Sequence, residues 1–448
     1  MSKACCMGYK LSTIMGINEI PKHWEEKEIK YCLKDGSEGI KIGPFGSALK
    51  SEMLVDNGYK VYGQENLIKD SFEIGHRFIT EEKFRELDVY EIRPGNVLIS
   101  MMGTIGKCKV VPKDIQRGIM DSHLIRLSFD ESVVLSEFAA LLIQEAFYIN
   151  VQLGVNSKGS IMSGLNSSII KNLKVLIPTL EEQKLILQYI NMKMRQLDGL
   201  IQNKHDLITL LEEQRQSMIT EAVTKGLNTN VKMKDSGVEW IGEIPEHWSV
   251  KKIKRLTSVK RGASPRPIDD PKYFDDQGEF AWVRIADVSS SDMYLTNTVQ
   301  RLSELGSNLS VKMKPGDIFL SIAGTVGKAC ITKINCCIHD GFVYFPDYKE
   351  NVKYLYFTFG SGEPYKGLGK MGTQLNLNTD TVGMISIPVP PLEEQNELVE
   401  FIESKVNENN NLINSIKEQI QKLKDYRQTL IYEVVTGKIG VRDFEVES

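Results

Sequence analysis

Basic residues concentrate in one stretch of the second half of the sequence. The segment Lys251–Ile268, KKIKRLTSVKRGASPRPI, contains seven lysines or arginines and no acidic residue. Cations beside a short Gly-Ala-Ser-Pro turn are suited to contact the phosphate groups of a nucleic acid. A solvated charged face explains such a run equally well, so the segment alone does not distinguish the two. Lys260, Arg261 and Arg266 are the candidates here.

The first half carries a weaker form of the same feature. Lys41 and Lys50 flank a Gly-Pro-Phe-Gly-Ser loop, with acidic residues interleaved before it. Lys158 and Lys370 each lie close to a glycine and a hydroxyl residue, which makes them a second type of candidate for phosphate contact. A charged surface face again remains the alternative.

Discrimination between bases requires side chains with paired hydrogen-bond donors or acceptors. Arginine suits guanine, whereas asparagine and glutamine suit adenine. By residue type alone, the candidates for base contacts are Gln64, Asn66, Arg266 and Arg284.

The segments GTIGK and GTVGK resemble a nucleotide-binding phosphate loop only superficially. That loop needs a glycine five residues before the Gly-Lys pair and a serine or threonine after it. Met101 and Cys108 occupy these positions in the first segment, and Ile322 and Ala329 in the second. A turn between two β-strands is the better interpretation of both.

Motifs of a DNA methyltransferase or a metalloenzyme are missing from the sequence. It has no N-P-P-[YF] or D-P-P-[YF] segment, no F-x-G-x-G segment, and no HExxH pair among its six histidines. His23 and His247 each precede a tryptophan, and we expect them to pack and hydrogen-bond within the fold. We therefore expect a non-catalytic chain with no metal or cofactor of its own.

The elements that position these residues occur twice. The segment PGNVLISMMGTIGK at 94–107 returns as PGDIFLSIAGTVGK at 315–328, with seven of fourteen residues identical at an offset of 221. Ile20–Trp24 returns as Ile244–Trp248, and LEEQ at 180–183 returns at 392–395. A duplicated scaffold with two diverged heads is suited to binding two different targets.

A long helix with one apolar seam follows each head. Apolar residues recur at steps of three and four from Leu180 onward, and again from Leu392, as in a coiled coil. The predicted seam comprises Ile190, Met194, Leu197, Ile201, Ile208, Leu211, Met218, Ile402, Val406, Ile413, Ile416, Ile420, Leu423 and Leu430. Arg215 and Arg427 fall in one equivalent slot of this seam. Setting the register of the helix pair is one interpretation, and charged ends that extend away from the seam are the interpretation we favour.

The two helices are expected to pair with each other in opposite directions. A helix over residues 181–224 is about 66 Å long at ~1.5 Å per residue. In a parallel pair, the roughly 20 residues from Lys225 to Pro245 would have to return along that whole length, although fully extended they cover only ~66–72 Å. An antiparallel pair needs no such return and places one head at each end. Two amphipathic helices packed on separate cores are the alternative.

Composition is that of a globular protein. Hydrophobic residues make up 41% and charged residues 25% of the 448, and the net charge of −4 argues against a uniformly basic surface. No run of eighteen apolar residues and no apolar leader segment is found, so we expect neither a membrane span nor secretion. Seven cysteines without zinc-ligand spacing suggest reduced thiols in the cytoplasm.

These motifs together resemble one known family. The I-P-x-H-W openings, the P-G-x-x-x-x-S-x-x-G-T-x-G-K blocks, the P-x-L-E-E-Q helix starts and the helix ends EAVTKG and EVVTGKI occur in the same order in both halves. They look like the specificity subunit of a Type I restriction–modification system, over all but the first dozen residues.

The resemblance implies a function and partners. Each head would be a target recognition domain that binds one half of a bipartite, asymmetric site in double-stranded DNA. The helices would set the spacing and dock two modification (methyltransferase) subunits, which use S-adenosylmethionine. Restriction (endonuclease and translocase) subunits would complete the complex.

The predicted fold class is α+β, with two mixed α/β target recognition domains joined by two long antiparallel coiled-coil helices in an internal pseudo-two-fold repeat. We expect a first recognition domain over 1–178, a helix over 179–226, a linker over 227–244, a second recognition domain over 245–390, a helix over 391–438 and a tail over 439–448. A stand-alone DNA methyltransferase and an assembly scaffold without DNA contact are the alternative functions.

If the helices act as a spacer, matched four-residue insertions in both should change the preferred gap between the two DNA half-sites. The bases preferred within each half-site should stay the same, because the heads are untouched. Selection of bound duplexes from a randomised library measures both quantities. An unchanged gap would contradict the spacer hypothesis.

Overall fold

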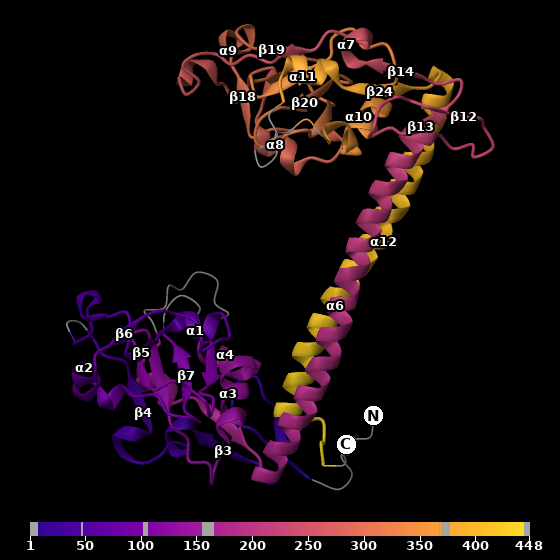
Figure 1. Ribbon diagram of the computed structural model, residues 1–448. Coiled ribbons are helices and arrows are strands. Elements are labelled where there is room, and N and C mark those ends of the chain that lie inside the picture. Colours follow the sequence, from indigo (N-terminus) through magenta and orange to yellow (C-terminus); the bar gives the residue numbers. More distant parts are fainter. Residues whose placement is uncertain are drawn as a thin grey trace. The chain divides into compact units, whose positions relative to one another are not determined.

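The computed structural model describes residues 8–45, 48–101, 106–154, 165–366, 368 and 377–442. The chain forms two compact units. The first combines Met1–Asn203 with Gln419–Ser448, and the second is Lys204–Glu418. Each unit contains one globular head and a part of each of two long helices (Figure 1).

Two small sheets form the centre of the first head. The antiparallel sheet has the order β4-β10-β7-β8, with strands Ile40–Ile42, Leu124–Leu127, Val97–Ser100 and Cys108–Val110. The other has the order β6-β5-β9, with strands Phe78–Ile79, Tyr59–Tyr62 and Gly118–Met120, and its β5–β9 pair is parallel. All four residues of β7 and of β10 are buried, which explains why these strands are nearly continuous apolar runs.

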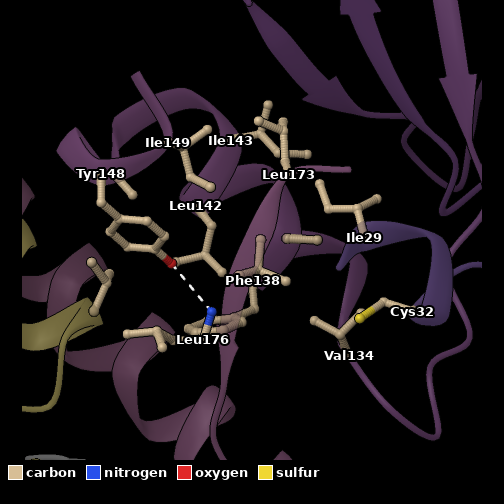
Figure 2. Close-up of a cluster of buried hydrophobic side chains, with 14 of the residues drawn as sticks. Ile29, Cys32, Val134, Phe138, Leu142, Ile143, Tyr148, Ile149, Leu173 and Leu176 are labelled. Carbon is tan, nitrogen blue, oxygen red and sulfur yellow. Dashed lines mark hydrogen bonds between the residues drawn. The ribbon is translucent and has the colours of Figure 1, made fainter. Parts of the chain in front are cut away.

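Short helices cover these sheets. In the first head they are α1 (Gln64–Ile68), α2 (Glu81–Glu86), α3 (Ser136–Glu145), α4 (Phe147–Gln152) and α5 (Ser167–Lys171). Figure 2 shows Phe138, Leu142 and Ile143 of α3 packed with Tyr148 and Ile149 of α4. The backbone N–H of Leu176 donates to the Tyr148 hydroxyl at 3.4 Å, so this buried phenol has a partner.

The second head repeats this arrangement with one more strand in each sheet. One sheet has the order β15-β23-β20-β21-β17, with strands Lys260–Arg261, Phe342–Tyr344, Ile318–Ser321, Ala329–Thr332 and Tyr294–Leu295. The other has the order β18-β16-β22-β19, with strands Gln300–Leu302, Phe280–Val283, Cys336–Ile338 and Val311–Met313. Its helices are α7 (Ile253–Leu256), α8 (Ile285–Ser290), α9 (Glu304–Asn308), α10 (Val352–Gly360) and α11 (Thr379–Met384).

A pair of two-stranded sheets joins each head to its helices. In the first unit, β1 (Tyr9–Leu11) pairs with β2 (Glu19–Pro21), and β3 (Glu25–Glu28) pairs with β11 (Lys174–Ile177). In the second unit, β12 (Met233–Asp235) pairs with β13 (Glu243–Pro245), and β14 (Ser249–Lys252) pairs with β24 (Ser386–Val389). The internal repeat expected from the sequence is therefore present in the fold.

The segment 227–244, expected to be a linker, is part of this repeat. It contains β12, and Ile241 is buried in the same apolar cluster as Trp248. The sequence stretch is rich in polar residues and glycine, which concealed a strand of only three residues. The tail beyond residue 438 is likewise packed, since Val441 is buried in the core of the first unit.

The two long helices are continuous. Helix α6 spans Leu180–Lys225 and α12 spans Leu392–Val435, with 46 and 44 residues respectively. A capping box begins α6, because the Glu182 N–H donates to Thr179 Oγ1 at 3.3 Å and the Thr179 N–H donates to the Glu182 carboxylate at 3.4 Å. Gly226 and Gly437 follow the helix ends with φ of 75° and 74°, a conformation that favours glycine.

The helices pair in opposite directions within each unit. In the first unit, Ile186 and Ile190 near the start of α6 share a core with Leu430 and Val434 near the end of α12. In the second unit, Ile219 and Val223 near the end of α6 share a core with Leu398 and Ile402 near the start of α12. All fourteen predicted seam residues are buried or half-buried.

The seam arginines make specific contacts across the helix pair. Arg215 Nη1 donates to Asn410 Oδ1 at 2.8 Å, and Arg427 Nη1 lies 2.8 Å from Asp198 Oδ1. Each arginine therefore bonds to the neighbouring helix. The expectation from sequence was instead that the charged end extends away from the seam. This position of the seam, occupied by arginine in both helices, therefore joins α6 and α12 by polar contacts as well as by packing.

Histidines at the head–helix junctions pack within the fold, as expected. His23 Nε2 lies 2.9 Å from the Glu182 carboxylate, and Arg442 Nε donates to that carboxylate at 2.8 Å. Burial opposes ionisation of Glu182, but the hydrogen bonds from Arg442 and His23 outweigh it, so the pKa of Glu182 is lowered. His247 makes the equivalent contact with Glu394 at 3.0 Å.

Truncation of the buried Phe138 should destabilise the first unit. Phe138→Ala removes a fully buried ring and leaves a cavity, so we expect the free energy of unfolding to fall by about 3–5 kcal/mol. Urea unfolding followed by circular dichroism measures this change. Phe147→Ala is the matched control, because Phe147 is 50% exposed and its loss should cost less than ~1 kcal/mol. Equal losses from both variants would contradict the assigned core.

Candidate DNA interface

Two of the sequence candidates in the second head, Arg261 and Arg266, contact Asp340. Arg261 Nε donates to the Asp340 carbonyl oxygen at 2.5 Å, and Arg266 Nη2 lies 2.9 Å from Asp340 Oδ2. Ser264 Oγ donates to Asp340 Oδ1 at 2.7 Å. The Ser264 hydrogen bond lowers the pKa of Asp340 although burial opposes this, and a backbone hydrogen bond and the charge of Arg266 act in the same direction as Ser264. Lys260 lies next to Arg261 in β15.

His339 directly precedes Asp340 and presents an N–H group. Its Nδ1 accepts a hydrogen bond from the Gly341 N–H at 2.8 Å, so the neutral ring carries its proton on Nε2. Burial lowers the pKa of His339, which favours this neutral form. The ring is flanked by Trp282 and Phe342, with centroid distances of 5.9 and 4.6 Å.

A hollow of about 480 Å³ opens beside this histidine. Arg284 and Gln300 contribute polar groups to it, and the Arg284 guanidinium donates to Gln300 Oε1. Trp282 and Phe274 contribute aromatic surface. The hollow therefore combines hydrogen-bond donors with flat apolar walls.

The first head has an equivalent site, which the strand registers identify. Strand β5 pairs with β9 in parallel and with β6 in antiparallel direction, as β16 pairs with β22 and β18. Matching these registers places Gly63 at the position of Arg284, Arg77 at that of Gln300 and Asp121 at that of His339. Lys41 in β4 corresponds to Lys260 in β15.

Two glycines independently support this equivalence. A Cβ atom on Gly43 would lie 1.8 Å from the carbonyl oxygen of Asp121, and one on Gly262 would lie 2.1 Å from that of His339. Both glycines follow the edge strand and allow the same close approach of two backbones. The two heads thus share one scaffold at this place.

The side chains at the equivalent site differ. Arg77 Nη2 lies 2.6 Å from Glu65 Oε1 and 3.0 Å from Asp121 Oδ2. A Cβ on Gly63 would lie 2.2 Å from Arg77 Nη2, so an arginine like Arg284 could not replace this glycine without displacing Arg77. The first head presents an arginine oriented by two carboxylates, and the second an arginine beside an amide and a histidine.

Comparison with known proteins identifies the family. Residues 42–213 and 245–422 match the Type I restriction modification DNA specificity domain. This chain belongs to that family. Among relatives, the specificity subunit of the type I restriction enzyme MjaVIII of Methanocaldococcus jannaschii is 28% identical over 91% of this chain and 93% of its own length.

Solved structures share the fold of this specificity subunit. A chain from a type I R-M system, whose structure concerns complex assembly and conformational transition, has a TM-score of 0.69 and 15% identity over 94% of this chain and 99% of its own. The HsdS subunit from Thermoanaerobacter tengcongensis has a TM-score of 0.54 and 16% identity over 95% of this chain and 99% of its own. The predicted α+β fold class with paired long helices is confirmed.

Several sequence candidates of the specificity subunit lie elsewhere or are unsuitable. Asn66 is 1% exposed, and its side chain bonds to the backbone of Gly63, Ser71 and Ile74, so it holds α1 in place and cannot contact a base. Lys50 is exposed and precedes a short 3₁₀ turn. Lys158 and Lys370 lie outside the described residues.

Two other candidates of the first head are half-buried. Lys41 has its Nζ 5.6 Å from the centre of the Tyr90 ring. The Oε1 atom of Gln64 is buried and accepts no hydrogen bond from the described part of the chain. Gln64 lies next to Gly63. It is therefore near Arg77, Glu65 and Asp121 but takes no part in their ion pairs.

Sequence reasoning missed Arg77, Asp121, Gln300 and His339. Their common signal is position, since each lies at or next to the end of a short strand in a paired sheet. The triplets Asp-Ser-His at 121–123 and His-Asp-Gly at 339–341, each between two apolar runs, carried this signal. They could be interpreted only once the parallel strand pairs were known.

Neither a metal-binding cluster nor a membrane-spanning helix is found among the described residues. Within them, no group of three His, Cys, Asp or Glu residues is arranged to hold a metal ion. No described helix combines the length and apolar character needed to cross a bilayer. The expected cytoplasmic location stays a prediction.

Gly262→Ala should disrupt the interface scaffold of the second head. The added methyl would overlap the His339 carbonyl, so we expect a loss of about 1–3 kcal/mol in unfolding free energy and reduced DNA binding. Thermal unfolding and a binding titration measure these effects. Gly360→Ala is the control, since Gly360 is helical with open space around it and the substitution should not destabilise. If Gly262→Ala left the free energy of unfolding unchanged, the close approach of Gly262 to the His339 carbonyl would be contradicted.

Proposed function

We propose that this chain is the DNA-binding specificity subunit of a Type I restriction–modification enzyme. Each head binds one half of a bipartite, asymmetric site in double-stranded DNA. The long helices set the separation of the half-sites and dock two modification subunits. The subunit works in the cytoplasm as the recognition component of a larger complex.

One observation carries the proposal. Two heads with the same strand registers place different groups at the same strand ends. The first has Arg77 and Asp121 beside Gly63, and the second has Arg284, Gln300 and His339. A repeated scaffold with divergent polar groups is suited to two unlike half-sites. Had the heads evolved only to pack against proteins, their divergence would not need to centre on hydrogen-bonding groups.

Electrostatics of the second head favour a polyanion. Lys260, Arg261 and Arg266 are all exposed; the first two form the edge strand β15 and the third follows it. Asp340 contacts both arginines and holds them in place, while leaving a net positive charge on this edge. Contacts of this kind to phosphates fix the position of a protein on DNA without conferring sequence preference.

The helices offer surface for protein partners. Leu207, Leu210 and Leu412, all in the second unit, lie outside the seam and are between 44% and 60% exposed. Apolar groups left over from the helix pair are typical of a docking face. We assign this face to the modification subunits, and restriction subunits would join through the assembled complex.

Catalysis is assigned to the partners. This chain lacks the N-P-P-[YF], D-P-P-[YF] and F-x-G-x-G segments of a methyltransferase, so we propose that S-adenosylmethionine and the methylated adenine bind in the modification subunit. A stand-alone methyltransferase is the less favoured alternative, and methyl transfer to DNA by the purified chain alone would revive it. An assembly scaffold without DNA contact is the other alternative. Charge reversal in the basic segment would leave the DNA affinity of such a scaffold unchanged.

Charge reversal of Lys260, Arg261 and Arg266 to Glu should weaken DNA binding. Removal of up to three phosphate contacts should lower affinity and reduce the slope of log K against log salt by about 0.9 for each phosphate that is no longer neutralised. A titration of labelled duplex at several salt concentrations measures both. A scaffold would show no change.

A matched control changes the same net charge elsewhere in the second head. Lys314, Lys333 and Lys349 are exposed and lie beyond the ends of β20, β21 and β23 that are opposite to Asp340. Their reversal to Glu should leave the salt slope nearly unchanged. Equal weakening by both triple variants would indicate a nonspecific charge effect and contradict the assigned edge.

A further inference from the structure

The Arg284 side chain is held in a fixed position although it is exposed. Its guanidinium donates to Gln300 Oε1, while Asp287 accepts only from the backbone N–H of Arg284, at 2.8 Å. Within the described chain, the Arg284 guanidinium has its hydrogen bond to Gln300 and no ion pair with a carboxylate. The group is therefore oriented without being paired to a carboxylate, unlike Arg77 in the first head.

The groups around Arg284 are mainly hydrogen-bond donors. Gln300 uses its carbonyl oxygen for Arg284, which leaves its amide N–H groups, and His339 contributes Nε2–H because Nδ1 already accepts from Gly341. All three residues line the hollow with Trp282. Asp269 also lines it and contributes the one carboxylate.

A surface rich in donors requires a ligand edge rich in acceptors. In the major groove, guanine presents two acceptors, N7 and O6, whereas adenine presents one acceptor and one donor. Arginine contacts the guanine edge with two parallel hydrogen bonds. A glutamine in front of adenine would need its carbonyl oxygen free, and here that oxygen is bonded to Arg284.

We infer that Arg284 contacts the guanine of one G·C base pair in the half-site bound by the second head. Gln300 and His339 are positioning residues that fix the guanidinium and the shape of the hollow. Arg261 and Arg266 contact the phosphates beside it. This inference rests on the proposed function and adds to it the identity of one recognised base and the residue that selects it.

The first head supports the assignment by contrast. Its equivalent of Arg284 is Gly63, and its arginine comes from the position of Gln300. A substitution at this place therefore changes which groups face the DNA while the strand registers stay the same. Such a position determines specificity without contributing to the fold.

The test is selection of bound duplexes from a library with both half-sites randomised, using the full-length chain and Arg284→Ala. Wild type should prefer G·C at one position of one half-site. The variant should lose this preference by roughly 5- to 150-fold, as expected for one bidentate contact, and keep every other position. Arg284→Lys, which retains the charge but not the fork, should lose the same preference and keep the salt dependence.

Arg255→Ala is the matched control, since Arg255 of α7 is exposed in the same head. It should leave all base preferences unchanged. Gln300→Ala should relax the same base pair as Arg284→Ala, and thermal unfolding should show that each variant is folded.

The outcomes separate the inference from the proposed function. Uniform weakening of Arg284→Ala across all sequences would make Arg284 a phosphate contact and overturn the inference alone. Loss of a preference for A·T would overturn it as well. A wild-type chain without any sequence preference would overturn the proposed function, and this inference with it.

Discussion

Burial of the apolar seam on α6 and α12 is the interaction on which the rest of the structure depends. A helix of 46 residues with one apolar face cannot bury that face against a small head alone. In each unit the seam is covered by the other helix, so each core includes a helix segment that belongs to the opposite repeat in sequence. Leu430 and Val434 complete the first core, and Ala222 and Val223 complete the one around Trp248.

Within each head, tight backbone contacts at strand ends fix where polar side chains can project. Gly43 and Gly262 allow an edge strand to approach the residue that follows a parallel strand. The side chains of Asp121 and His339 are therefore presented from equivalent places. Since the scaffold is insensitive to what these side chains are, it can carry different hydrogen-bonding groups in its two copies.

Periodicity and repetition made the large features of the fold predictable from sequence. Steps of three and four in the apolar residues predicted both long helices, and the reach of the connection predicted their opposite directions. Heads built from strands of two to four residues are different, because such strands carry little periodicity and their pairing depends on contacts distant in sequence. Strand β12 was consequently mistaken for linker.

The site was only partly predictable for the same reason. Arg261, Arg266 and Arg284 stand out by residue type, and the structure places them next to Asp340 or His339. Gln300 and His339 are ordinary in sequence, and only the registers of β16, β18 and β22 place them beside Arg284. Asn66 is the opposite case: its residue type suggested a contact with adenine, but its side chain caps the five-residue helix α1.

The composition of the first unit from both ends of the chain has a consequence for biosynthesis. The second unit is continuous from Lys204 to Glu418, whereas the first needs Gln419–Arg442 to cover Trp24 and to engage Glu182. On the ribosome, the domain translated first is therefore the one finished last. Until the final helix emerges, its unprotected core is the part of the nascent polypeptide most exposed to chaperones and proteases.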